Sequence, residues 1–300
     1  MSNVIPFSVP RAKSQSGQIE ALIRCFATQR RFGDDVFWLK ENAELLNILY
    51  SSGLSVDPEH LAPYRSFYAS IEKRMLFFPQ YYRFLLSITQ DLEALGLARG
   101  KAVPLANWVD AQSLVSAELS DLQRAEANRL LRRGGLKIAS REDGLNERLH
   151  RFINHSQTFA VPNKKAAYEL THIVFYLSEY GHQDPKISAA ALISLEFAGL
   201  LALLDQNVDL LSEICIAMRF AGGIPPSEWE AWIAKELGDY QISECPNGAV
   251  QDDYHSYFMC NWLASLRDSP VFQGKMLARA MSFQAARKSA SPLRGLSESI

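Results

Sequence analysis

The feature that most constrains this chain is the run from Ile187 to Leu204, which reads ISAAALISLEFAGLLALL. It has the length of a helix, and its only charge is Glu196, near the middle. A carboxylate buried without a partner is costly, so a buried Glu196 is neutral, paired with a cation, bound to a metal or beside water. Three of these four outcomes describe a polar site. We therefore expect an interior polar pocket around Glu196.

The same run just reaches the minimum length of a membrane span, but its central glutamate and its alanine, serine and glycine content disfavour insertion. The chain has no second segment of this kind. We therefore predict a central core helix from Ile187 to Leu204 and no association with a membrane.

Composition predicts a packed globule and argues against a nucleic-acid partner. The chain has 300 residues, of which 48% are hydrophobic and 11% aromatic. Its 31 basic and 33 acidic residues give a formal net charge of -2, so no overall positive field attracts phosphates.

The N-terminal sequence and the cysteines favour a reducing cytoplasm. The first residues, MSNVIPFSVPRAKSQSGQ, are polar and contain two prolines, unlike the apolar stretch of a signal peptide. The four cysteines form no CxxC pair, which favours neither a zinc knuckle nor a disulfide framework: Cys25, Cys215, Cys245 and Cys260.

Helical periodicity recurs along the whole chain and predicts an all-α protein of about ten to twelve helices. Helices of about 15 residues joined by short turns suit an α/α toroid, an α-solenoid or a large bundle. The expected helices cover residues 18–31, 35–53, 57–75, 79–96, a short piece around 108, 120–133, 141–155, 163–180, 187–204, 207–220, 227–238, 252–267 and 270–287.

One helical domain is expected over residues 18–287, between a flexible segment at 1–17 and a disordered tail at 288–300. Gly134 and Gly135 form the clearest internal break, so two helical lobes meeting near 134–140 are a further expectation.

Two Glu-x-x-His pairs place a carboxylate and an imidazole on one helix face, as in ferritin-like di-iron sites. The first pair, Glu147 and His150, opposes the apolar arc of its helix, so we expect it to be solvated. The second pair, Glu169 and His172, is bordered by tyrosines and phenylalanine, as in a pocket wall. The alternative is a partly exposed face on which Lys165 pairs with Glu169.

His255 has an apolar setting, because Phe258, Met259 and Trp262 share its side of the expected helix. Asp252 lies one turn earlier, where a carboxylate can accept the imidazole N–H and raise the basicity of the ring. The alternative is that Asp252 caps the helix and His255 is an ordinary core histidine.

If these residues converge, His172, His255, Glu196 and Glu169 could bind Zn or Fe, with the first three as catalytic groups. A proton-transfer pair in an apolar pocket is the other possible chemistry. Arg219 is a rival partner for Glu196 and would make the site structural. No P-loop, nucleotide-binding glycine motif, nucleophile elbow or HExxH motif occurs.

Three segments resemble an uncharacterised family of helical bacterial proteins, of alphaproteobacterial type: GDDVFWLKENAELLNIL, KKAAYELTHIVFYLSEYG and DDYHSYFMCNW. The middle segment, with its ELTH sequence, is the most distinctive. The resemblance implies a coherent family with a domain of unknown function in a cytoplasmic bacterial setting. It implies no activity and no catalytic residue.

Two classes of function follow from the sequence. The first is a small-molecule-binding protein or metal-dependent enzyme with a buried histidine and carboxylate site. The second is a helical adaptor or scaffold that binds a protein partner on a concave surface. A glutamate in the most apolar helix favours the first class, because a scaffold does not need one.

Overall fold

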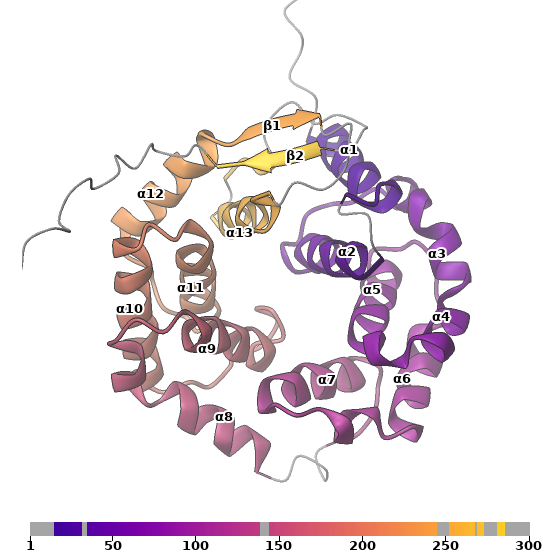
Figure 1. Cartoon of the computed structure of the whole chain (residues 1–300), viewed down its shortest axis with the longest axis horizontal. Coiled ribbons are helices and arrows are strands. Elements are labelled where there is room, and N and C mark those ends of the chain that lie inside the picture. Colours follow the sequence, from indigo (N-terminus) through magenta and orange to yellow (C-terminus); the bar gives the residue numbers. More distant parts are fainter. Residues whose placement is uncertain are drawn as a thin grey trace, which may run out of the picture. The chain divides into compact units, whose positions relative to one another are not determined.

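The computed structural model describes residues 15–31, 35–138, 144–244, 252–267, 269–272 and 281–285. These residues form thirteen α-helices, several short 3₁₀-helices and two short strands, so the predicted all-α class is confirmed (Figure 1). Most of the expected flexible start, the expected disordered tail, Cys245 and residues 139–143 lie outside the described residues. The choice among toroid, solenoid and bundle stays a prediction.

The chain divides into two compact units. Unit 1 comprises residues 1–146 and 264–280, and unit 2 comprises residues 147–263 and 281–300. Each unit is described below by itself.

Unit 1 is built around α2 (Asp35–Ser51) and α5 (Tyr82–Ala94), which pack against each other. Asn42 of α2 is fully buried, and its amide donates to the carbonyl oxygens of Phe26 and Trp38 at 3.0 and 2.8 Å. Its Oδ1 accepts a hydrogen bond from the Tyr64 hydroxyl at 2.5 Å. Besides α2 and α5, unit 1 contains α1 (Gln15–Thr28), η1 (Pro58–Tyr64), α3 (Arg65–Ala69), α4 (Ile71–Phe77), η2 (Pro79–Tyr81), α6 (Ala102–Ala111), η3 (Leu114–Ala117) and α7 (Asp121–Arg133).

The helix expected to run from Asp57 through Met75 is broken into three pieces, η1, α3 and α4. Its start is as predicted, because the Asp57 side chain accepts a hydrogen bond from the Glu59 N–H at 3.0 Å and Pro58 is the first residue. Pro63 within η1 lacks a backbone N–H, which explains why a continuous α-helix does not form there.

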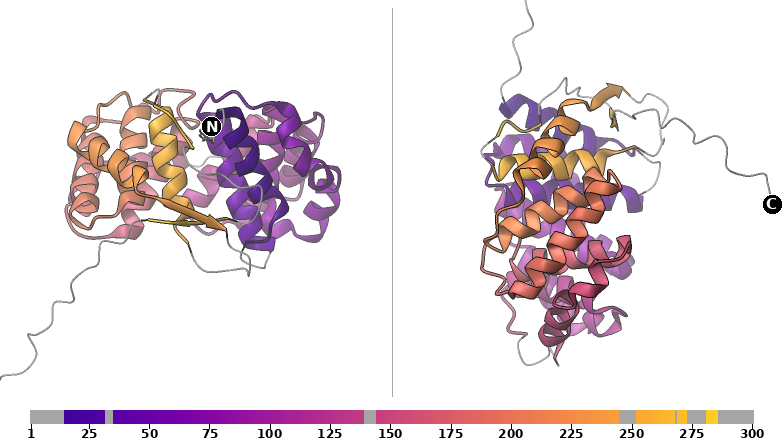
Figure 2. Two further views of the ribbon diagram at one scale, coloured as in Figure 1. Left: turned by 90° about the horizontal axis from the view of Figure 1, so that it is seen from above. Right: turned by 90° about the vertical axis from the view of Figure 1, so that its left-hand side faces the viewer.

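Unit 2 is built around α11 (Val208–Phe220), which packs against helices on three sides. These neighbours are α9 (Lys164–Leu177), α10 (Ala189–Leu204) and α12 (Ser227–Gly238). The course of the chain through these helices can be followed in Figures 1 and 2. The unit also contains η5 (Ser156–Phe159), β1 (Gln241–Glu244), β2 (Met281–Gln284) and all but two residues each of α8 (Leu145–Ile153) and α13 (Tyr254–Ser265).

The prediction of a helix over residues 270–287 is wrong at 281–284, which form β2. β2 pairs antiparallel with β1, with Phe283 opposite Ile242. Phe283 is fully buried and packs against Tyr257 of α13 in a tilted arrangement, with ring centroids 4.9 Å apart. The Asp252 Oδ2 accepts a hydrogen bond from the Phe283 N–H at 2.9 Å, which ties the strand to the start of α13. These tertiary contacts override the local helical preference.

The prediction of a central core helix from Ile187 to Leu204 is also wrong. The helix is α10, and its buried face carries mainly small side chains, whereas four of its large apolar side chains are exposed. The buried face consists of Ala191, Ser194, Leu195, Ala198, Gly199 and Ala202. The exposed face contains Glu196 with Ile193, Phe197, Leu200 and Leu204. The small residues let neighbouring helices pack closely against the buried face of α10. Because its opposite face is exposed, α10 is a surface helix.

No helix in the described part of the chain is long and apolar enough to cross a membrane.

Gly199 is the closest point of packing on α10. A Cβ atom at this position would lie 2.2 Å from Cζ3 of Trp229 in α12. We expect Gly199→Ala to lower the free energy of unfolding by about 1–3 kcal/mol, because the indole ring must move. Gly238→Ala is the control, since a Cβ at that exposed end of α12 meets nothing within 4 Å. Urea denaturation of both variants tests this; equal stabilities would contradict it.

Candidate functional site

A histidine and carboxylate cluster lies within unit 2, between α9, α11 and α13. Its first element is the contact of His255 on α13 with Asp209 in the first turn of α11, where Nδ1 lies 2.7 Å from Oδ1. A carboxylate at this distance orients the imidazole ring and fixes which nitrogen carries the proton.

The second element is Glu213, one helical turn after Asp209 on α11. Its side chain is 1% exposed. The Thr171 hydroxyl on α9 lies 2.6 Å from Oε2, and His172 Nε2 lies 3.7 Å from the same oxygen. A buried carboxylate needs such partners, because desolvation of the charge is costly.

Tyr168 completes the set, because its hydroxyl donates to Asp209 Oδ2 at 2.8 Å. Burial, together with the negative charge of Asp209, raises the pKa of Tyr168 above its ordinary value, so this phenol stays a hydrogen-bond donor. Burial also raises the pKa of the Cys260 thiol on α13 to about 12, and Asp209 adds to that shift. Cys260 is therefore neutral and unreactive in the folded protein at neutral pH.

Asp209, Glu213 and His255 each offer one ligand atom, and these three atoms all lie within 4.8 Å of one another. The side chains of Asp209 and His255 are 15% and 28% exposed, and that of His172 is 37% exposed. The cluster therefore runs from the buried Glu213 outward to two half-buried imidazoles. The cluster is therefore exposed to solvent on the side of the two histidines.

Two of the four residues predicted from the sequence lie at this cluster, and two do not. His255 belongs to the three-residue group, and His172 contacts Glu213 beside it. Glu169 is half-buried and faces Lys165, whose Nζ lies 3.9 Å from its Oε1, as in the alternative of an i, i+4 pair. Glu196 is on the exposed face of α10, so the expectation of an interior pocket around it is wrong.

Two sets of partners differ from one of the alternatives considered. Of the two roles open to Asp252, contact with His255 and capping of the helix, the structure shows the second, and a carboxylate in contact with the His255 ring is that of Asp209. The Asp252 carboxylate binds the backbone N–H groups of Tyr254 and Phe283 instead, which matches its alternative role at the helix start. Arg219, the expected rival partner of Glu196, pairs with the buried Glu230 of α12 at 2.6 Å.

Sequence reasoning missed Asp209, Glu213 and Thr171. Glu213 lies near the centre of VDLLSEICIAMRF, where leucine and isoleucine surround it. A carboxylate in such an apolar helix needs a polar partner when it is buried, as was expected of Glu196. Asp209 precedes it by four residues and shares its helix face. The two carboxylates, four residues apart in an otherwise mostly apolar helix, are the sequence signal for this site, and the helix is buried over most of its length.

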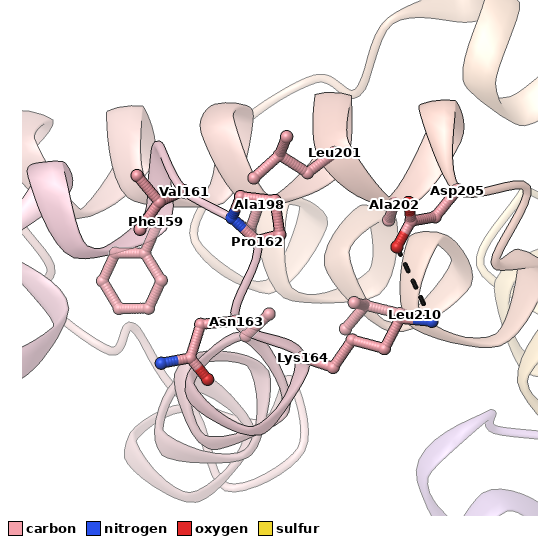
Figure 3. A pocket seen from close by; sticks show the side chains of 11 residues that line it. Phe159, Val161, Pro162, Asn163, Lys164, Ala198, Leu201, Ala202, Asp205 and Leu210 are labelled. Atoms are coloured by element: carbon pink, nitrogen blue, oxygen red, sulfur yellow. Dashed lines mark ion pairs between the residues drawn. The ribbon is translucent and has the colours of Figure 1, made fainter. Parts of the chain in front are cut away.

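A separate recess in unit 2 lies between the start of α9 and the second half of α10 (Figure 3). Its wall is mostly apolar, with Phe159, Ala198 and Leu210 among the lining residues. The exposed Lys164 and Asp205 pair across it at 3.6 Å, as the dashed line shows. Exposed ion pairs of this kind contribute little energy, and the recess brings together no second polar group of catalytic type. The cluster is therefore the candidate site.

Substitution of Thr171 tests whether the hydrogen bond from its hydroxyl to the buried Glu213 carboxylate stabilises the fold. In metal-free protein kept in a chelator, we expect Thr171→Val to lower the free energy of unfolding by about 1.5–3 kcal/mol, because Glu213 loses a hydrogen bond in a buried site. Thr171→Ser retains the hydroxyl and should lose only the smaller contribution of one methyl group. Guanidinium denaturation measures both; a valine variant as stable as the serine variant would contradict the account.

Comparison with curated proteins and with solved structures finds no match to this chain. A family model for a domain of unknown function, DUF6902, matches residues 1–300. The chain therefore belongs to the DUF6902 family.

Proposed function

We propose that unit 2 binds a divalent transition-metal ion and is the active unit of a metal-dependent enzyme that acts on a small molecule. The observation that carries this proposal is the convergence of Asp209, Glu213 and His255, whose ligand atoms lie within 4.8 Å of one another. Two of these ligands come from one turn of α11 and the third from α13.

The donor set fits zinc, iron(II) or manganese(II) better than calcium. One imidazole nitrogen with carboxylate oxygens is a borderline set, whereas calcium takes six to eight oxygen ligands. The 2.7 Å contact of His255 with Asp209 is slightly shorter than the spacing of two ligands around one ion. Metal binding would therefore replace the shared proton and move the two groups apart by a few tenths of an ångström.

The hydrogen bonds around the carboxylates support the same proposal. The Tyr168 hydroxyl donates to Oδ2 of Asp209, and the Thr171 hydroxyl donates to Glu213. Partners of this type orient metal ligands and raise metal affinity by about 10–100-fold. A metal held by three protein ligands keeps a position for water and lowers the pKa of that water.

His172 is suited to proton transfer at this site. Its imidazole is half-buried, and Nε2 faces the Glu213 carboxylate at 3.7 Å. An imidazole can both accept and donate a proton, so His172 would serve as the proton-transfer group beside a metal held by Asp209, Glu213 and His255. Hydrolytic chemistry at a metal-bound water is the reaction class that this arrangement supports best.

Metal binding is measured by zinc titration calorimetry of chelator-treated protein, with metal content checked by mass spectrometry. We expect one zinc per chain and a loss of affinity of at least about a hundredfold in Asp209→Asn, Glu213→Gln and His255→Ala, because each removes a ligand. Affinity should fall as pH is lowered from about 7.5 to about 5.5, because protons compete for the imidazole and the carboxylates.

Glu169→Gln and Glu196→Gln are matched controls, since both remove a carboxylate from unit 2 outside the cluster. They should bind zinc like the wild type. Folded wild-type protein that binds no zinc, iron or manganese, or binds them equally well without Glu213, would contradict the proposal.

A second candidate function, a helical adaptor, is favoured by the exposed face of α10. Ile193, Phe197, Leu200 and Leu204 recur at spacings of four, three and four residues and are 42%, 39%, 49% and 70% exposed. An apolar stripe at this spacing is typical of a helix that packs against a partner helix.

The adaptor function is tested by placing a photo-crosslinking amino acid at Leu200 and irradiating cells that express the protein. A discrete crosslinked protein partner, lost when Phe197 is also changed to Asp, is the expected outcome, because a buried interface does not tolerate a charge. Crosslinks that survive Phe197→Asp would rule out this face. The Leu200 crosslinker variant should bind zinc with the same affinity with and without Phe197→Asp.

A further inference from the structure

Unit 1 contains an apolar recess where the chain breaks between α4 and α5. Pro79 cannot continue the α4 helix, so the chain turns through η2 and re-enters α5 at Tyr82. The recess lies beside this turn and beside the start of α2, and its volume is about 420 Å³, including the part open to solvent. Its apolar wall is formed by Val36, Trp38, Leu39, Phe78 and Leu85.

Apolar surface continues from the recess onto the end of α4. Phe78 lines the recess and is 50% exposed, and the neighbouring Phe77 is 72% exposed. Their ring centroids lie 6.5 Å apart, so the two rings form an apolar rim of a kind that marks a binding surface. The recess and this rim would cover the apolar part of a ligand.

Arg74 supplies a positive charge at the wall of the recess. Its Nε donates to the Ser70 hydroxyl at 3.1 Å, and its guanidinium carbon lies 5.1 Å from the centre of the Phe67 ring. Among the described residues no carboxylate pairs with Arg74, so its terminal N–H groups are available to a ligand oxygen. A guanidinium held in place in this way binds a carboxylate through two parallel hydrogen bonds.

The other polar groups at the recess leave this charge uncompensated. Asp35 lines the recess, but its Oδ1 accepts a hydrogen bond from Arg30 Nε at 2.7 Å. The Tyr81 hydroxyl makes no hydrogen bond with another described residue and can donate to a ligand. The recess therefore combines an apolar wall with a cation and a neutral donor, and it favours an anionic head group.

We propose that this recess is a binding site for a small amphipathic carboxylate, such as a medium-chain fatty acid. The apolar chain would lie against Trp38, Leu39 and Leu85, and the carboxylate would face Arg74 and Tyr81. This site belongs to unit 1 and uses no residue of the metal cluster in unit 2.

The test uses calorimetric titration of the full chain with decanoate below its micelle concentration, with decanol as the neutral ligand of equal chain length. We expect saturable binding of one decanoate per chain, and affinity for decanol at least about tenfold weaker, because decanol makes no charge-assisted pair with Arg74. Arg74→Gln should weaken decanoate binding at least about tenfold and leave decanol binding unchanged.

Val36→Trp and Arg65→Gln complete the design. The first adds a large side chain at the wall of the recess and should abolish binding of both ligands without unfolding the protein, because Val36 is 39% exposed. The second removes an exposed arginine of unit 1 that pairs with Glu59, and it should bind decanoate like the wild type.

No saturable binding, equal affinity for decanoate and decanol, or full decanoate affinity in Arg74→Gln would each overturn the proposal. Binding to zwitterionic lipid vesicles without saturable decanoate binding would also overturn it, and would assign the apolar rim to a membrane surface instead. None of these results bears on zinc binding in unit 2.

Discussion

The structure of unit 2 depends on the burial of one carboxylate, that of Glu213. Its side chain is 1% exposed at the middle of α11, the helix around which the unit is built. A buried carboxylate needs polar partners, and here α9 supplies the hydroxyl of Thr171, which donates to Glu213, and the imidazole of His172 at 3.7 Å. This requirement fixes how α9 lies against α11. One turn away, the contacts of Asp209 with Tyr168 and His255 bring α9 and α13 to the same place.

The same contacts that satisfy the buried charges give the cluster its chemical character. Carboxylates locked by hydroxyl donors and an imidazole with a fixed orientation are the features of a preorganised metal site. The graded exposure from Glu213 to His172 provides a dry interior and an accessible rim. α10 contributes differently, since mainly small side chains pack inward and four large apolar ones are exposed. Unit 2 thus carries an accessible polar cluster and, on α10, an apolar surface.

The sequence predicts elements whose signals are local. The N-cap at Asp57 and most helix ranges are as expected, because capping and periodicity act within a few residues. The role of Glu196 could not be predicted, since α10 is apolar on every side and its sequence does not show which face is buried. His172 and His255 were identified, but their partners Asp209 and Glu213 come from another helix and depend on tertiary packing. β2 was missed for the same reason, because its partners are β1 and Asp252.

Anomalous X-ray diffraction from crystals grown with zinc, measured above and below the zinc edge, tests whether the cluster in unit 2 binds a metal. We expect one strong anomalous peak at about 2.0–2.2 Å from oxygen atoms of Asp209 and Glu213 and from a ring nitrogen of His255. The Asp209 to His255 hydrogen bond should then be replaced by two metal–ligand bonds. No peak at this cluster, with the 2.7 Å hydrogen bond retained, would contradict it and leave Glu213 as a structural buried carboxylate.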